Sequence, residues 1–199
     1  QLGGTQQIVE LAEKLGAAVV TSDGAKGAFP EDHAQSLGQI MGKRIWGENP
    51  VQDWLGTCDL VVVLGSILPQ RSTSGIGLQL PKEMVHVLLD GEAIGKNYPV
   101  TVPIVANSQA VVQQWLGAIG DQDVHKGKAF QEDISAIRSN MRERLEDTWS
   151  NELRVYETVR EVTPRNTIFS LDPAVAASRA TRCLEIYEPR TYMHPHGWL

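Results

Sequence analysis

The sequence has only two cysteines and no long hydrophobic run. Cys58 and Cys183 lie far apart and match no metal-binding or redox spacing, so we expect two small buried thiols. No apolar stretch approaches the roughly 18 residues that a membrane span requires. The first residues, Gln1 to Gly4, lack the basic and then apolar order of a signal peptide. The sequence therefore predicts no membrane partner and a cytoplasmic location.

Positive charge is also scarce. The 199 residues contain 18 Lys and Arg against 24 Asp and Glu, which gives a formal net charge of -6. Because no basic stripe stands out, nucleic acid is not expected as a partner. A chain of this length can form one sizeable core and part of a second one.

The most apolar stretch, Asp59 to Ser74, predicts a strand followed by a functional loop. Its β-branched run is short and ends at Gly65, which is typical of a fully buried parallel strand. Ligands of open α/β sheets bind where strands end. Arg71 and the hydroxyl side chains at 72–74 would therefore suit a phosphate or a carboxylate. A solvated arginine in a surface loop is the alternative interpretation.

Strands and helices alternate through the first 120 residues. One helix opens at Gly3-Gly4-Thr5 and ends at Gly16, and Asn107 caps another that runs to Ile119. Further strands are predicted at Ala17–Ser22, Met84–Asp90 and Val102–Ala106, and a short helix at Asn49–Thr57. This order predicts an α/β fold with a mainly parallel, Rossmann-like sheet and helices on both faces. Because a glycine-rich helix start normally follows a strand, we expect the first strand to be missing.

After Gly120 the sequence becomes rich in charge. Asp121–Trp149 and Glu152–Val162 are predicted as two helices, Thr167–Leu171 as a strand and Ala174–Leu184 as a helix. We therefore expect three parts. These are a central Rossmann-like domain at 1–120, a helical connector at 121–163, and the truncated start of a second α/β domain at 164–199.

Three stretches taken together resemble a known family. They are TSDGAKGAFPEDH at Thr21–His33, the strand end LGS at Leu64–Ser66, and IGKNYPV at Ile94–Val100. In this order and spacing they resemble the central domain of thiamine-diphosphate-dependent enzymes, in the branch of acetolactate synthase, pyruvate oxidase and benzoylformate decarboxylase. From Pro164 onward the chain resembles the start of the family's diphosphate-binding domain.

The resemblance implies an activity for the parent enzyme. It implies decarboxylation of a 2-keto acid followed by carboligation, with thiamine diphosphate and Mg²⁺ held mainly outside these residues. The family's catalytic glutamate and metal-binding motif are not found in the sequence, so we expect no catalytic residue, no metal ligand and no activity of the fragment alone. The expected partners are the missing amino-terminal and carboxy-terminal domains and further subunits, in a homodimer or homotetramer. The alternative is a stand-alone nucleotide- or FAD-binding module without catalysis.

The resemblance also suggests positions for a flavin. In flavin-binding members FAD lies across this domain, and the corresponding residues here are Gly3, Gly4, Thr21, Gly65, Ser66, Arg71 and Asp90. Ile67 and Leu88 stand where those members have an arginine and an aspartate. Apolar side chains cannot hydrogen-bond a buried ribose or pyrophosphate. A scaffold without a tightly bound flavin is therefore the competing interpretation.

Three further polar residues have two interpretations each. Asp172 follows the predicted strand at a place where relatives contact the diphosphate of the cofactor, but an aspartate there can also cap the next helix. His194, two residues before His196, suits either the mouth of an active site or a plain loop. His86 lies on an apolar strand and is expected to be a core histidine rather than a base.

Overall fold

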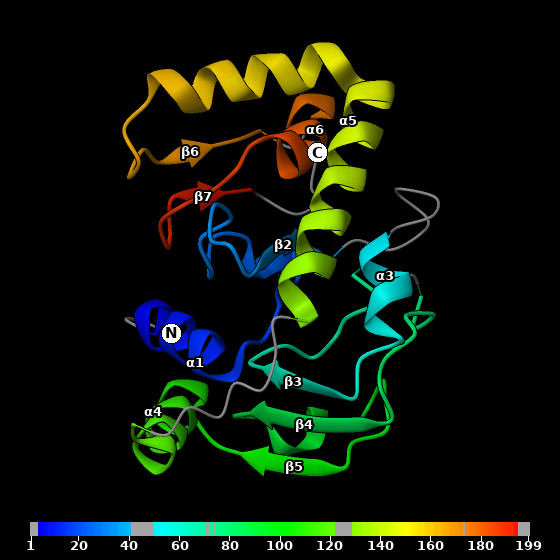
Figure 1. Ribbon diagram of the computed structural model, residues 1–199, viewed down its shortest axis with the longest axis vertical. Helices are drawn as coiled ribbons and strands as arrows, with labels where there is room; N and C mark the ends of the chain where they lie inside the picture. The colour runs from blue at the N-terminus through cyan, green and yellow to red at the C-terminus, as the bar shows by residue number, and fades with distance from the viewer. Residues whose placement is uncertain are drawn as a thin grey trace. The chain divides into compact units, whose positions relative to one another are not determined.

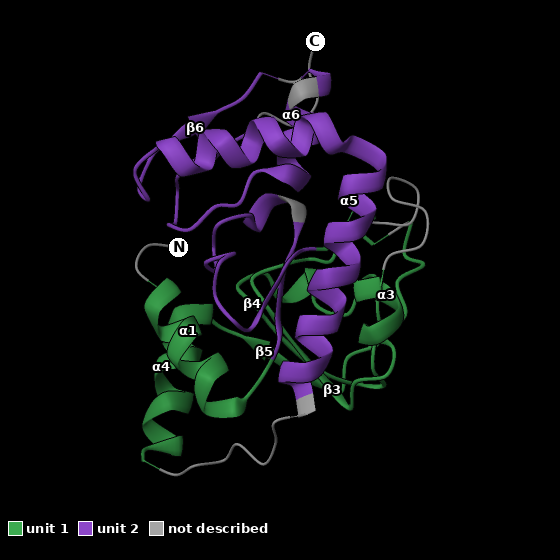
Figure 2. Cartoon of the chain, turned by 45° about the horizontal axis from the view of Figure 1, so that its top comes forward, with its two compact units in different colours: residues 1–17, 40–127 green, residues 18–39, 128–199 purple. Residues whose placement is uncertain are grey.

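The computed structural model describes residues 4–40, 50–70, 72–73, 75–121, 129–172 and 174–194. The chain divides into two compact units (Figure 2). Unit 1 contains residues 1–17 and 40–127, and unit 2 contains residues 18–39 and 128–199.

Unit 1 is built on a parallel sheet in the order β3-β4-β5 (Figure 1). The strands are β3 (Leu60–Leu64), β4 (Glu83–Leu88) and β5 (Val102–Val105). Val63 lies opposite His86, and Val87 lies opposite Ile104. The α/β class with parallel strands, predicted from the alternation of elements, is confirmed.

Helices α1 (Thr5–Leu15), α3 (Pro50–Leu55) and α4 (Ser108–Ile119) belong to the same unit, with the short helix η2 (Gly91–Ala93) after β4. Gly16 ends α1 in the left-handed conformation, at φ 60°. The Asn107 side chain accepts hydrogen bonds from the amides of Gln109 and Ala110 at the start of α4. Both predicted helix boundaries are therefore confirmed.

The sequence predicted that the strand after Asp59 is fully buried, and this prediction is wrong. Leu60 and Val62 of β3 are 47% and 37% exposed, whereas Val87 of β4 is completely buried. The reason is position, because among the described residues β3 has one hydrogen-bonded neighbour, β4, whereas β4 lies between β3 and β5. An apolar run reports the type of element, but it does not distinguish a central strand from an edge strand.

Unit 2 contains a second parallel pair, β1 (Val19–Thr21) and β2 (Ser36–Gln39), joined through the short helix η1 (Asp23–Ala25) and a turn-rich loop. The sequence predicted β1 and the loop but not β2. That strand has four residues and includes Gly38 at φ 68°, so it lacks the apolar run that marks a strand. Leu37 of β2 is nevertheless 1% exposed.

The rest of unit 2 is largely helical. It comprises α5 (Ala129–Val162), α6 (Val175–Cys183) and the two-residue parallel strands β6 (Phe169–Ser170) and β7 (Tyr192–Met193). Trp149 interrupts α5 with non-helical angles, φ -142° and ψ 47°, and the helix bends there (Figure 1). The sequence predicted two helices that meet at this place. Ala180, Leu184 and Ile186 form the core against Tyr156 and Phe169.

The two cysteines differ in burial. Cys183 is 5% exposed, as expected for a buried thiol, whereas Cys58 is only half-buried. Among the described residues, no helix is both long and apolar enough to cross a membrane. The domain boundaries expected near residues 120 and 163 stay a prediction.

Candidate functional site

The loops after β3 and β4 form one edge of the sheet in unit 1. Gly65 follows β3 at φ 68°, and its amide donates a 2.9 Å hydrogen bond to the carbonyl of Val87. Asp90 follows β4. Because carboxyl ends of parallel strands meet at the same edge, the structure brings Gly65, Ser66 and Asp90 to the side where α/β sheets bind ligands.

The loop after β3 is held by residues from three parts of the unit. The Ser66 hydroxyl accepts a hydrogen bond from the amide of Leu68 (3.1 Å), and the Ser66 carbonyl lies 2.8 Å from Nε2 of His86. The Asn97 side chain donates to the carbonyls of Ile67 (3.0 Å) and Leu68 (3.2 Å). His86 is 3% exposed and bonded, as expected of a core histidine. Sequence reasoning assigned no role to Asn97, although it lies within the IGKNYPV segment.

The polar side chains at this edge are already engaged locally. Asp90 accepts a 3.0 Å hydrogen bond from the amide of Glu92 and so caps η2. Thr73 and Ser72, expected to face a ligand beside Arg71, are 0% and 3% exposed. The Thr73 hydroxyl donates to the carbonyl of Pro69 instead. Ile67 and Leu88, which stand where flavin-binding members have an arginine and an aspartate, differ in exposure. Ile67 is 50% exposed, and Leu88 is buried.

The remaining positions suggested for a flavin are Gly3, Gly4, Thr21 and Arg71. Gly3 and Arg71 lie outside the described residues. Gly4 is the N-cap of α1, where an added Cβ would come 3.7 Å from the side chain of Gln109 in α4. Thr21 belongs to unit 2, where its buried hydroxyl donates to the carbonyl of Gly38 (3.3 Å).

A second edge forms in unit 2, where β6 and β7 end. The amide of Leu171 donates to the carbonyl of Met193 (3.0 Å), which places Asp172 and His194 at the ends of neighbouring parallel strands. Helix α6 starts directly after this edge. Its N-cap is Ala174, with no side-chain capping bond, and its first turn has no acidic residue. The suggestion that Asp172 caps this helix is therefore wrong, because Ala174 holds that position.

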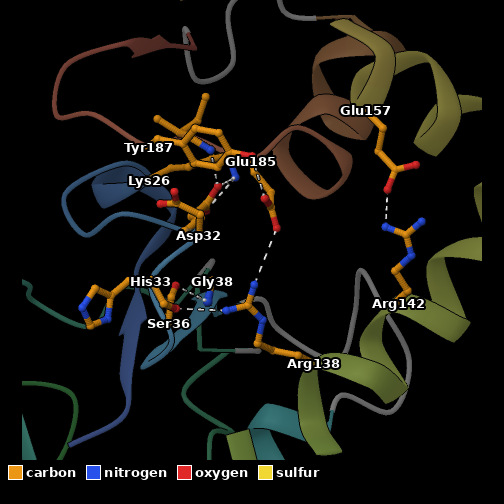
Figure 3. Close-up of polar contacts among 12 residues, drawn as sticks. Lys26, Asp32, His33, Ser36, Gly38, Arg138, Arg142, Glu157, Glu185 and Tyr187 are labelled. Carbon is orange, nitrogen blue, oxygen red and sulfur yellow. Dashed lines mark hydrogen bonds and ion pairs between the residues drawn. The ribbon is translucent and has the colours of Figure 1, made fainter. Parts of the chain in front are cut away.

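Charged residues converge on the loop between β1 and β2 within unit 2 (Figure 3). Lys26 pairs with Glu31 at 2.7 Å, and both side chains are almost completely buried. Arg165 pairs with Asp32 at 2.5 Å and with Glu188 at 3.0 Å. Arg138 donates to the carbonyl of His33 (3.0 Å). Arg138 and Arg165 lie more than a hundred residues from His33 and Asp32, so only the place of these partners in the FPEDH motif could have drawn attention to them.

Neighbouring groups shift the pKa values of Asp32 and Tyr187 in this part of unit 2. The hydrogen bond from Arg165 lowers the pKa of the Asp32 carboxyl below its ordinary value. Burial, together with the charge and hydrogen bond of Glu185, raises the pKa of Tyr187 to about 12. Neither group titrates near neutral pH, so we assign both to structural contacts rather than to proton transfer.

Comparison with known proteins identifies the fold and its relatives. Residues 2–115, more than half of the chain, match the family described as thiamine pyrophosphate enzyme, central domain. The chain belongs to the thiamine pyrophosphate enzymes. The family resemblance seen in the sequence is thereby confirmed, and the match runs from the residues before α1 into α4.

Similar thiamine pyrophosphate enzymes include acetolactate synthases. The acetolactate synthase of Mycobacterium avium is 32% identical over 139 residues, which are 66% of this chain and 22% of that protein. The acetolactate synthase large subunit of Haemophilus influenzae is 27% identical over 119 residues, 59% of this chain and 20% of that subunit. A Bacillus subtilis protein, YdaP, whose name describes it as containing thiamine pyrophosphate, is 27% identical over 201 residues, 96% of this chain and 30% of its own. The chain thus spans less than a third of these relatives.

The described residues fit part of a thiamine pyrophosphate site. The N-cap of α6, Ala174, makes no side-chain capping bond, and the first turn has no acidic residue, so this helix start is suited to a diphosphate. Among the described residues no three His, Cys, Asp or Glu side chains gather into a metal site. The carboxyl edge of β6 and β7 therefore fits the anionic end of the cofactor rather than a complete metal centre.

Proposed function

We propose that this chain is part of a thiamine-diphosphate-dependent enzyme that decarboxylates a 2-keto acid and transfers the remaining unit to an acceptor, as in acetolactate synthase. The main support for this proposal is the match of residues 2–115 to the family's central domain. The similarity to the Bacillus protein, which extends over 96% of the chain, supports the same assignment for the carboxy-terminal part. Thiamine diphosphate supplies the electron sink for such a reaction when it is bound.

The chain's own residues take binding and scaffolding roles in this proposal. The amides at the start of α6 bind the diphosphate, and Asp172, just before them, orients the turn that presents these amides. The carbonyl of Asp172 accepts a 2.7 Å hydrogen bond from the amide of Ala174, which fixes that turn. Magnesium and the groups that move protons belong to other parts of the enzyme. The domain boundaries near 120 and 163, a homodimeric or homotetrameric assembly and a cytoplasmic location are further parts of this proposal.

We propose further that the sheet of unit 1 is a scaffold without a tightly bound flavin. The side chains of Ser66 and Asp90 accept hydrogen bonds from the nearby backbone amides of Leu68 and Glu92. Ile67 and Leu88 offer no hydrogen bond to ribose or pyrophosphate, which need polar partners once buried. The competing function, a stand-alone FAD-binding module, predicts a flavin absorbance band in protein saturated with FAD and passed through a desalting column. The scaffold function predicts no such band.

Replacement in a relative tests the main proposal. The aligned stretch of the Mycobacterium avium acetolactate synthase is exchanged for the corresponding residues of this chain, and acetolactate is measured with pyruvate, thiamine diphosphate and Mg²⁺. We expect acetolactate from the chimera and none from the 199-residue chain alone. A chimera that assembles like the parent and makes no acetolactate would contradict the proposed activity. Product from the chain alone would show that its catalytic groups lie within these residues.

A further inference from the structure

Glu31 holds both backbone polar groups of one distant residue, Ile186. The amide of Glu31 donates to the carbonyl of Ile186 (3.0 Å), and the amide of Ile186 donates back to the Glu31 carboxylate (2.7 Å). Glu31 is 6% exposed and Ile186 is completely buried. Water therefore cannot replace these two bonds without opening the contact.

Lys26 supplies the countercharge that this buried carboxylate requires. Its ammonium group lies 2.7 Å from both oxygens of Glu31, and its side chain is 3% exposed. An isolated buried carboxylate is strongly unfavourable, so the pair acts as a unit. Lys26 also lies over the ring of Tyr192, 5.7 Å from its centroid. The pair thus contacts both ends of the segment that runs from Ile186 to β7.

This segment determines where the second edge lies. Tyr192 begins β7, and β7 pairs with β6 through the amides of Phe169 and Leu171, which donate to Thr191 (2.8 Å) and Met193 (3.0 Å). Asp172 and the start of α6 follow immediately. A shift of Ile186 and Tyr192 would therefore move the edge at which those amides are presented.

We propose that Glu31, held by Lys26, is a positioning residue for the edge that binds the diphosphate. This inference rests on the proposed function, because it takes the start of α6 as the diphosphate site. Glu31 itself does not touch the cofactor. It acts through Ile186 and β7, and it links the loop between β1 and β2 to the carboxy-terminal part of unit 2.

Hydrogen exchange in the 199-residue chain tests the contact. Replacing Glu31 by alanine removes the acceptor, and we expect exchange of the Ile186 and Leu171 amides to become about tenfold faster or more. E31Q keeps an oxygen acceptor and should restore most of the protection. K26M leaves the carboxylate without its countercharge, and we expect amide exchange rates between those of E31Q and E31A. Glu161→Ala, which removes an exposed carboxylate on α5, is the matched control and should change neither amide.

Equal exchange of these amides in the wild type, E31A and K26M would overturn the contact. If E31A does not fold, K26M still decides, because unchanged exchange of both amides in K26M would also overturn the contact. Faster exchange throughout α5 in a folded E31A would show general destabilisation and would overturn a positioning role.

The wild-type and variant sequences are then placed in the Bacillus YdaP protein in exchange for its aligned stretch, because magnesium and other cofactor contacts belong to other parts of the enzyme. Thiamine diphosphate with Mg²⁺ is added to these chimeras. We expect protection of the amides at the start of α6 in the wild type and in E31Q, with a half-saturating concentration raised about tenfold in E31A. No protection in the wild type would overturn the diphosphate site of the proposed function. Protection that is the same in the wild type and E31A would leave that site in place and overturn the role of Glu31.

Discussion

Gly27 lies so close to Ile186 that a side chain between them has no room. A Cβ added at Gly27 would come 2.7 Å from Cγ2 of Ile186 and 3.3 Å from the carbonyl oxygen of Glu188. Gly27 also has φ 81°, a conformation that favours glycine. The loop between β1 and β2 therefore packs against the segment after α6 so closely that only glycine fits at position 27.

Gly27→Ala should lower the free energy of unfolding of unit 2 by about 2 to 4 kcal/mol, from left-handed strain and overpacking together. Urea unfolding measures this change. Gly24→Ala, at the start of the same loop, is the matched control, because a Cβ there meets nothing within 4 Å and φ is not positive. Equal loss in both variants would show that the loop does not tolerate any added side chain.

Asn107→Ala should destabilise the start of α4. The Asn107 side chain accepts from the amides of Gln109 (2.9 Å) and Ala110 (3.3 Å), and loss of such a cap typically costs about 1 kcal/mol. Gln114→Ala, an exposed change in the middle of the same helix, should stay within about 0.5 kcal/mol of the wild type. Thermal or urea unfolding measures both. A cap variant as stable as the Gln114 variant would mean that water replaces the side chain without loss.

The ion pair of Asp32 with Arg165 should contribute to stability only while Asp32 is ionised. The pKa of Asp32 is lowered in the folded chain by the Arg165 hydrogen bond. The contribution is therefore fully present above the ordinary value of 3.8 and is lost as the pH falls through the lowered folded pKa. Because both side chains are partly exposed, we expect Asp32→Asn to lose less than about 1 kcal/mol at neutral pH.

Urea unfolding of the wild type and Asp32→Asn at neutral and at strongly acidic pH checks this prediction. The difference between the two proteins should shrink in acid. Asp147→Asn, on an exposed face of α5, should show no such dependence. A difference between wild type and Asp32→Asn that stays constant down to acid pH would rule out an electrostatic origin.

The two thiols should react at very different rates. Burial raises the pKa of Cys183 to about 11, and the residue is 5% exposed, whereas Cys58 is half-buried. With a thiol reagent at mildly alkaline pH, Cys58 should be modified first and Cys183 only slowly. In Cys58→Ser the fast phase should disappear, and in urea the remaining thiol should react at once. A fast phase that survives in Cys58→Ser would contradict the burial of Cys183.

Much of the fold follows from local sequence. The apolar run before Gly65 predicts β3, and the cap at Asn107 predicts α4. The two helices predicted at Asp121–Trp149 and Glu152–Val162 adjoin at the bend in α5. These features depend on residues that are neighbours along the chain. The glycine-containing stretches and the IGKNYPV segment are likewise sufficient to identify the family, because their order and spacing can be seen in the sequence alone.

Only the tertiary structure decided which strand lies at an edge and which side chains meet. The exposed face of β3 and the short strand β2 depend on the neighbours that a strand finds, and a run of letters does not contain them. Glu31 meets Ile186, and Asp32 meets Arg165, across more than a hundred residues of chain. Such contacts form because folding buries distant segments together, and their energy depends on burial and geometry that no local pattern encodes.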